Sequence, residues 1–130
     1  MPIPVLLVED VYHLRGVVVE LLRSLGDFSI VAEIGTEAEA RLWLEENPGA
    51  WQLAIVDLIL EHGTGMGVID QARKAAPHAR VVVFSDYATP GIRQHCLKLG
   101  ADAVFQKSTE VPAFADYCAT LAANATEPPK

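Results

Sequence analysis

Residues 53–65 read LAIVDLILEHGTG, and this stretch decides the fold because a single carboxylate, Asp57, stands between two aliphatic runs. Ala-Ile-Val precedes Asp57 and Leu-Ile-Leu follows it. An apolar run of this length, ended by polar and glycine residues, predicts a buried strand over 53–60. A charged carboxylate is costly to bury without a partner. Asp57 is therefore expected where the strand meets other polar groups.

Four further apolar runs accompany the central one, and most are continuous and rich in β-branched residues. Such runs are typical of parallel strands that are covered on both faces. They are PVLLV (4–8), SIVAEI (29–34), RVVVFS (80–85) and DAVFQK (102–107).

Helical patterns lie between these runs. Residues 11–25 carry one apolar stripe before Gly26, made of Leu14, Val17, Val18, Leu21 and Leu25. The other helices are predicted from the Thr36–Glu39 capping box to ENPG (46–49), over 66–76 before Pro77, from an N-cap at Thr89 to Gly100, and over about 111–124. Five alternating βα units predict an α/β fold, a doubly wound parallel sheet in the order 2-1-3-4-5 with five helices.

Composition bounds the class of protein. The 130 residues fit one domain, expected over 1–124 with a short polar tail at 125–130, and 51% of them are hydrophobic. A net charge of −7 argues against direct nucleic-acid binding, and no run reaches the ~18 apolar residues that span a membrane. Cys96 and Cys118 have no metal-ligand spacing and are expected to be reduced thiols of a cytoplasmic protein.

Four of the five predicted strands carry polar side chains toward their carboxyl ends. They are Glu9 and Asp10, Asp57, Ser85, and Lys107. Because the carboxyl ends of parallel strands meet at one edge of a sheet, these side chains are expected to share a site. Three carboxylates repel one another, and Mg²⁺ with oxygen ligands would neutralise them. A carboxylate beside such an ion can attack phosphorus and form an aspartyl phosphate.

These residues resemble the receiver domain of two-component response regulators, from about Pro4 to about Ala123. The matching segments are VED (8–10), VDLIL with GTG downstream (56–65), VVVFS (81–85) and GADAVFQK (100–107). The resemblance implies a flavodoxin-like receiver fold. It also implies a signalling module whose only chemistry is Mg²⁺-dependent self-phosphorylation and self-dephosphorylation.

The resemblance assigns a role to each site residue. Asp57 would be the phosphoacceptor, Ser85 would hydrogen-bond the phosphoryl oxygen, and Lys107 would pair with it. Mg²⁺ would be held by Asp10, Asp57 and the backbone carbonyl of Ile59, with Glu9 acting through a metal-bound water. The implied donor is a histidine kinase or a phosphotransfer protein. Phosphorylation would change the face of the fourth predicted helix, fifth strand and fifth helix, which would meet an unknown downstream protein or a second copy of the chain.

Three positions depart from the family pattern. Asp86 stands where a small residue commonly follows the strand-end hydroxyl, and a charge about 5 Å from a phosphoryl group would cost roughly 3 kcal/mol at an effective dielectric near 20. Asp86 must therefore point outward or disfavour phosphorylation. Val104 replaces an aromatic switch residue, and Phe105 should face the other way. Ser108 replaces a proline that follows the lysine in a cis bond, so a trans peptide is expected there.

Other functions remain open on the sequence alone. The domain would be a phosphorylation-independent binding module if Asp86 and Val104 abolish the switch. It would instead be the N-terminal receiver of a longer regulator if the tail begins a linker; otherwise it is a stand-alone receiver. A phosphatase with an aspartyl-phosphate intermediate usually has a second acid two residues after the nucleophile, where this chain has Ile59.

Overall fold

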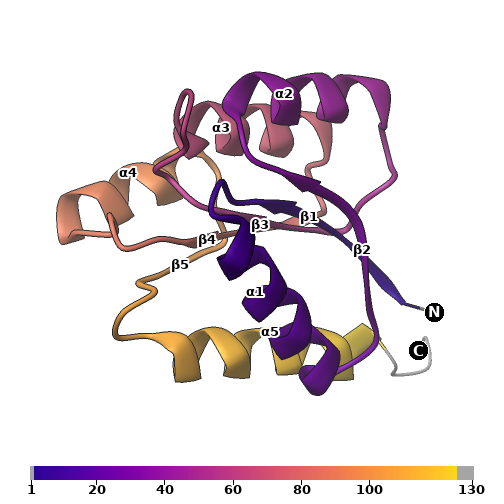
Figure 1. Cartoon of the computed structure of the whole chain (residues 1–130). Helices are drawn as coiled ribbons and strands as arrows, with labels where there is room; N and C mark the ends of the chain where they lie inside the picture. Colours follow the sequence, from indigo (N-terminus) through magenta and orange to yellow (C-terminus); the bar gives the residue numbers. More distant parts are fainter. Residues whose placement is uncertain (1, 126–130) are drawn as a thin grey trace.

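Five parallel strands form one sheet in a computed structural model that describes residues 2–125 (Figure 1). Their order is β2-β1-β3-β4-β5, as predicted, so β1 and β3 are neighbours at the point where the order reverses. The strands are β1 (Ile3–Val8), β2 (Phe28–Ile34), β3 (Leu53–Val56), β4 (Arg80–Phe84) and β5 (Ala103–Phe105).

A helix follows each strand. The helices are α1 (Tyr12–Leu25), α2 (Glu37–Glu46), α3 (Gly65–Ala75), α4 (Pro90–Leu99) and α5 (Val111–Ala125). Their predicted caps are confirmed: the Thr36 hydroxyl accepts a hydrogen bond from the Glu39 N–H, and the Thr89 hydroxyl accepts one from the Ile92 N–H. Gly100 ends α4 at a φ of 118°, in the left-handed region that favours glycine. Of the predicted polar tail 125–130, only Ala125, the last residue of α5, lies among the described residues.

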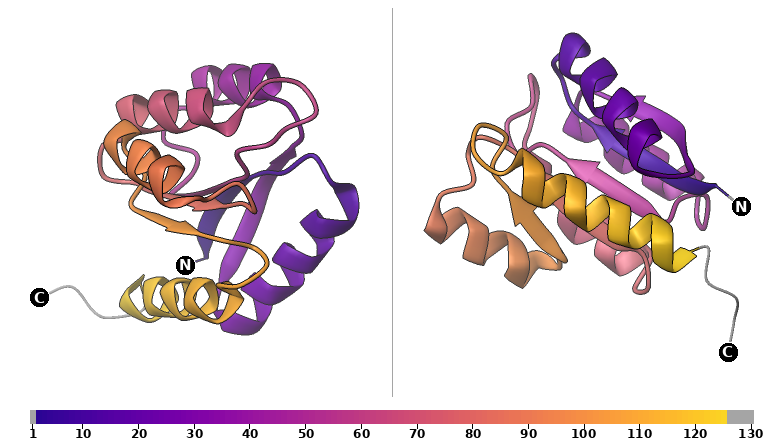
Figure 2. Two further views of the ribbon diagram at one scale, coloured as in Figure 1. Left: turned by 90° about the vertical axis from the view of Figure 1, so that its left-hand side faces the viewer. Right: turned by 90° about the horizontal axis from the view of Figure 1, so that it is seen from below.

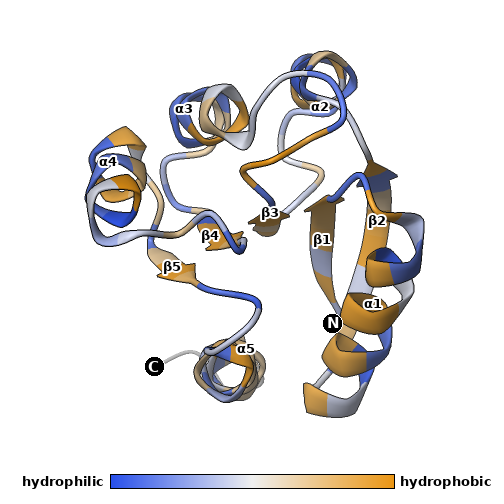
Figure 3. Ribbon diagram, turned by 60° about the vertical axis from the view of Figure 1, so that its left-hand side comes forward, coloured by the Kyte–Doolittle hydropathy of each residue, from blue (hydrophilic) through white to orange (hydrophobic). Residues whose placement is uncertain are grey.

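The helices cover both faces of the sheet. Helices α2, α3 and α4 lie on one face, and α1 and α5 lie side by side on the other (Figures 1 and 2). Successive strand residues alternate between the two cores: Leu6 and Val8 face the first, and Val5 and Leu7 face the second. This alternation between two covered faces explains the continuous apolar runs, which Figure 3 shows as mostly apolar strands between helices of mixed hydropathy.

The central strand is shorter than the prediction of 53–60. Strand β3 ends at Val56, and the three aliphatic residues after Asp57 belong to a loop. Leu58 and Leu60 are buried, whereas the Ile59 side chain is 54% exposed and Ile59 forms an isolated antiparallel bridge with Thr64. A loop that turns two alternate residues into the core has the same composition as a strand, which is why the apolar run was misleading. The carboxylate therefore lies just beyond the end of its strand.

The apolar stripe predicted for α1 is only partly correct. Val18 is buried as expected, but Val17 is 50% exposed, and Leu22, which the predicted stripe omitted, is fully buried. The segment from Val17 to Leu22 is almost entirely apolar, so the sequence leaves the rotational phase of the helix open.

Two further features bear on sequence predictions. Cys96 and Cys118 are free and buried in opposite cores, and burial raises the pKa of Cys118 to about 12. Among residues 2–125, no helix is long and apolar enough to cross a membrane.

Candidate functional site

The sheet itself fixes the backbone of three site residues. Each of the three comes directly after a strand and donates its N–H to a neighbouring strand. Glu9 donates to the Ile34 carbonyl at 2.8 Å, and Asp57 donates to the Val8 carbonyl at 2.9 Å. Ser85 donates in the same way to the Phe105 carbonyl at 3.0 Å. The sheet therefore fixes the backbone from which these three side chains extend at its carboxyl edge.

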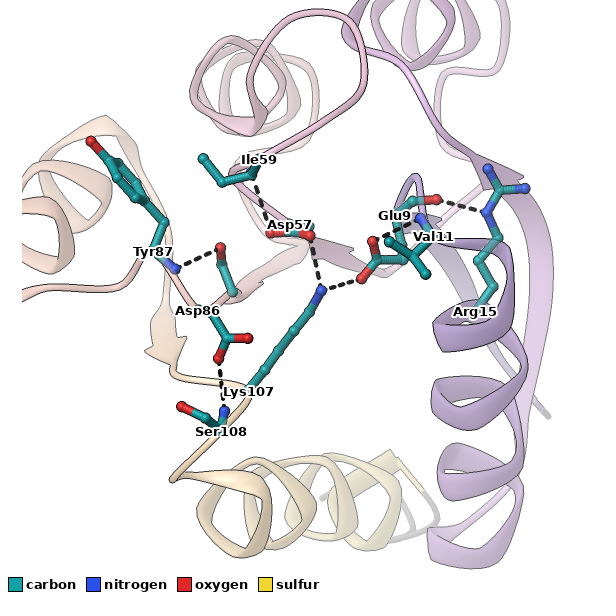
Figure 4. Close-up of polar contacts among 10 residues, drawn as sticks. Glu9, Val11, Arg15, Asp57, Ile59, Asp86, Tyr87, Lys107 and Ser108 are labelled. Atoms are coloured by element: carbon teal, nitrogen blue, oxygen red, sulfur yellow. Dashed lines mark hydrogen bonds and ion pairs between the residues drawn. The ribbon is translucent and has the colours of Figure 1, made fainter.

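Lys107 joins two of the predicted acids. Its ammonium donates one hydrogen bond to Glu9 and another to the Asp57 Oδ2 at 2.9 Å (Figure 4). The side chains of Glu9 and Asp57 are 3% and 8% exposed, and that of Lys107 is 15% exposed. Burial alone lowers the pKa of Lys107, but the hydrogen bonds to the two acids outweigh it, and the pKa lies above its ordinary value. The amine is therefore charged at neutral pH.

Three carboxylates form a cluster, and two of them contact this ammonium. Glu9, Asp10 and Asp57 each offer one oxygen, and these oxygens all lie within 4.8 Å of one another. When all are ionised, the single charge of Lys107 leaves two negative charges uncompensated. Burial raises the pKa of Glu9 above its ordinary value, since its bonds from Lys107 and Val11 offset only part of the desolvation. The all-oxygen donor set and its charge suit a divalent cation such as Mg²⁺.

The loop after β3 holds the Asp57 carboxylate in place. Its Oδ1 accepts a hydrogen bond at 3.2 Å from the N–H of Ile59, two residues further on. Gly65, where α3 begins, lies so close that a Cβ there would sit 2.2 Å from the Asp57 carbonyl oxygen. Only glycine allows this approach. The side chain is thus oriented by its own loop as well as by Lys107.

Ser85 and Asp57 line one cavity of about 350 Å³. The Ser85 hydroxyl is buried and accepts a hydrogen bond from the Tyr87 N–H at 3.2 Å, which leaves its own hydrogen to be donated. The cavity is also lined by Asp10, Ile59 and Lys107, so it brings together five of the six predicted site residues. The sixth, Glu9, contacts it through Lys107.

The acids after β1, Glu9 and Asp10, do not cap the following helix. Helix α1 has Val11 as its N-cap, without a side-chain hydrogen bond. The Glu9 carboxylate instead accepts the Val11 N–H at 3.1 Å. Arg15, which the sequence did not single out, donates to the Glu9 carbonyl at 2.6 Å. No sequence signal marks that contact, because its acceptor is a backbone carbonyl.

The three departures from the family pattern each have a visible outcome. Asp86 turns away from Asp57 and accepts the Ser108 N–H at 2.9 Å (Figure 4). Val104 is buried in the core beneath α2, α3 and α4, whereas Phe105 faces α5, with its ring centroid 5.9 Å from that of Phe114. The predicted opposite orientation is confirmed. The described residues contain no cis peptide bond, so the Lys107–Ser108 bond is trans, as predicted.

Comparisons with known proteins agree with this geometry. The family described as the response regulator receiver domain matches residues 5–117. A photosynthetic apparatus regulatory protein, RegA, from Cereibacter sphaeroides is 33% identical over 96 residues, which cover 74% of this chain and 45% of that protein. RegA of Rhodovulum sulfidophilum is 35% identical over 71 residues, covering 55% of the chain and 37% of the relative. The chain thus spans less than half the length of these relatives.

Solved structures share the fold at low identity. The CheX–CheY–BeF₃–Mg²⁺ complex from Borrelia burgdorferi has a chain with a TM-score of 0.83 and 17% identity, covering 93% of this chain and 90% of that one. A response regulator receiver domain from Rhodospirillum rubrum has a TM-score of 0.76 and 21% identity, with coverage of 98% and 97%.

Proposed function

The chain belongs to the response regulator receiver domain family, and we propose that it accepts a phosphoryl group on Asp57 in a Mg²⁺-dependent reaction. One observation carries the proposal. A buried carboxylate lies beside two further acids, a charged lysine and a buried hydroxyl, all at the carboxyl edge of the sheet. The cluster also has an excess of negative charge over the single ammonium of Lys107.

The reaction is a transfer of a phosphoryl group to a carboxylate oxygen of Asp57. The new oxygen–phosphorus bond forms while the bond from phosphorus to the donor's leaving atom breaks, and the leaving group keeps that electron pair. Lys107 already contacts Asp57 and would neutralise part of the charge on the phosphoryl oxygens. The Ser85 hydroxyl, fixed by the Tyr87 N–H, would donate a hydrogen bond to one of those oxygens.

The proposed metal ligands are Glu9, Asp10, Asp57 and the backbone carbonyl of Ile59. When bound, Mg²⁺ would supply the positive charge that allows a phosphoryl group to approach the acids. The clustering of three carboxylate oxygens supports this donor set, and Ile59 lines the same cavity.

The proposed phosphodonor is a histidine kinase or a phosphotransfer protein, and the proposed output is a protein contact on the α4–β5–α5 face. Arg93 of α4 connects the three elements of this face, because it donates to the Val104 carbonyl in β5 and to Glu110 just before α5. Homodimerisation through this face is part of the proposal. Val104 leaves no aromatic side chain at the position of the family's switch, so the response would depend on polar contacts such as these.

The test is phosphorylation by a small phosphodonor. Wild-type protein incubated with Mg²⁺ and acetyl phosphate is expected to gain one phosphoryl group that is stable in acid and labile in base, as measured by intact-protein mass spectrometry. Asp57→Asn, which preserves shape and removes the nucleophile, is expected to gain none. An equal mass gain in both proteins, or none in the wild type, would favour a phosphorylation-independent binding module.

A further inference from the structure

The carboxylate of Asp86 and the backbone of Ser108 connect two loops of the site. Asp86 comes directly after Ser85, and Ser108 comes directly after Lys107. The Asp86 Oδ1 accepts the Ser108 N–H at 2.9 Å across 22 positions of sequence (Figure 4). Each end of this hydrogen bond is therefore one residue from a proposed site residue.

The bond lies where the sheet no longer holds the chain. Strands β4 and β5 pair as far as Phe84 and Phe105, and the last ladder bond runs from the Ser85 N–H to the Phe105 carbonyl. Lys107 comes after that point, in a turn. Its long side chain must nevertheless hold one orientation to reach Glu9 and Asp57, which costs conformational entropy. A fixed backbone beneath the lysine reduces that cost.

Several hydrogen bonds hold the turn that carries Lys107. Within the turn, the Gln106 N–H donates to the Glu110 carboxylate at 3.1 Å, and the Glu110 N–H donates to the Gln106 carbonyl at 2.9 Å. From outside the turn, Asp86 accepts the Ser108 N–H. The bond to Asp86 therefore connects the turn directly to the loop after β4.

The two residues that depart from the family pattern, Asp86 and Ser108, are joined by this one hydrogen bond. Proline has no N–H and could not donate this bond, so Asp86 has a partner because the residue after Lys107 is serine. The carboxylate is turned toward Ser108 and not toward Asp57, although Asp86 also lines the cavity that contains Asp57. Asp86 itself is exposed, so its charge remains solvated.

We propose that Asp86 is a positioning residue: by accepting the Ser108 N–H it fixes the backbone of Lys107, and so places the lysine against the carboxylate of Asp57. The inference rests on the proposed function, since the position of Lys107 matters to the reaction only if Asp57 is phosphorylated. The oxygen acceptor of Asp86 is the required feature, and its negative charge is not.

Two substitutions separate these features. Asp86→Ala removes the acceptor and the charge, whereas Asp86→Asn keeps an amide oxygen and removes the charge alone. With acetyl phosphate and Mg²⁺, Asp86→Ala is expected to slow phosphorylation about fivefold, and Asp86→Asn to stay within about twofold of the wild type. Ser108→Ala keeps the N–H and is the matched control, expected to match the wild type. If the charge of Asp86 acts by repulsion instead, both Asp86 variants will be faster, and the proposal is wrong.

A second readout does not depend on phosphorylation. Amide hydrogen exchange by NMR is expected to show a protected Ser108 N–H in the wild type and in Asp86→Asn, and rapid exchange in Asp86→Ala. The Lys107 ammonium signal is expected to broaden only in Asp86→Ala. Unchanged Ser108 protection in Asp86→Ala would overturn the inference even if phosphorylation proceeds. A wild type that cannot be phosphorylated would overturn the proposed function, while these signals still decide the role of Asp86.

Discussion

The two ends of the sheet each contain a network of cations and carboxylates, but only the network at the amino end has a cation for every carboxylate. At the amino ends of β4 and β5, Arg73 pairs with Asp102 at 2.5 Å, and Arg80 lies 3.6 Å from the same carboxylate. The Asp102 carboxylate also accepts the Val81 N–H at 2.8 Å. The remaining donors of Arg73 are taken by backbone carbonyls, those of Ala76, Pro77, Ala79 and Gly100.

The carboxyl end has the opposite charge balance. There one ammonium, that of Lys107, faces a cluster of three carboxylates. The hollow at the amino end is the larger, about 520 Å³, but its lining is mainly apolar and includes Trp51 and Leu53. The smaller cavity, with Asp57, has the reactive groups. A network in which every carboxylate has a cation stabilises the fold, whereas one with carboxylates in excess is suited to a cationic ligand.

The largest expected effect tests the network of Arg73 and Asp102 at the amino end. Arg73→Ala removes one of the two cations that pair with Asp102 and leaves several carbonyls without their donor, so we expect the free energy of unfolding to fall by about 2 to 3 kcal/mol. Chemical denaturation measures this. The control is Lys74→Ala, at the next position of the same helix. It removes an exposed ion pair with Asp70 and is expected to lower the free energy of unfolding by at most about 0.5 kcal/mol. Phosphorylation of folded Arg73→Ala should match the wild type; a loss of activity without a loss of stability would contradict the division between the two ends.

An intermediate effect is expected at the carboxyl end, where the carboxylates are in excess. Mg²⁺ at ten times its dissociation constant should raise the free energy of unfolding of the wild type by about 1.4 kcal/mol. Asp10→Asn removes one of the clustered charges, so it should stabilise the metal-free protein slightly and lose most of the gain from Mg²⁺.

The control for this prediction is Glu45→Gln, which removes an exposed acid on α2. It should respond to Mg²⁺ like the wild type, because its charge lies outside the cluster. Thermal or chemical unfolding with and without Mg²⁺ measures all three proteins. An equal gain in Asp10→Asn would mean that the ion stabilises the protein through some other surface.

The sequence predicted the architecture because the alternation of apolar strands and amphipathic helices admits few parallel topologies. It also predicted that acids from β1 and β3 would share an edge with Ser85 and Lys107, since that follows from the strand order. The end of β3 was not predictable, because Leu58 and Leu60 point inward from a loop as they would from a strand. In α1, an almost continuous apolar segment concealed which face is buried.

Contacts to backbone groups were beyond sequence reasoning altogether. The Asp86–Ser108 bond joins a side chain to an N–H that every residue except proline has, so nothing in the composition marks it. The Arg15 bond to the Glu9 carbonyl is hidden for the same reason. The residue types alone identify the charged cluster. The backbone contacts that orient its side chains depend on the tertiary structure.

The smallest expected effect concerns a third network, which lies on the α4–β5–α5 face and is balanced one to one. Arg93 donates to Glu110, and their side chains are 34% and 32% exposed. The hydrogen bond from Arg93, with a smaller contribution from the Gln106 N–H, holds the pKa of Glu110 below its ordinary value. A depressed folded-state pKa stabilises the protein above the unfolded pKa of about 4.3, and this stabilisation is lost as the pH falls through the folded value.

Glu110→Gln should therefore be less stable than the wild type at neutral pH, and the difference should shrink as the pH falls well below the ordinary carboxyl pKa of about 4.3. Denaturant midpoints of the two proteins across this range measure it, with Glu45→Gln as the control, since no hydrogen bond or ion pair of its exposed side chain is found in the described chain. The expected difference is small because solvent screens a pair exposed to this degree. A difference that grows on acidification would mean that the Glu110 carboxylate is destabilising. The α4–β5–α5 face would then resemble the carboxyl end of the sheet, where carboxylates are in excess, and not the amino end.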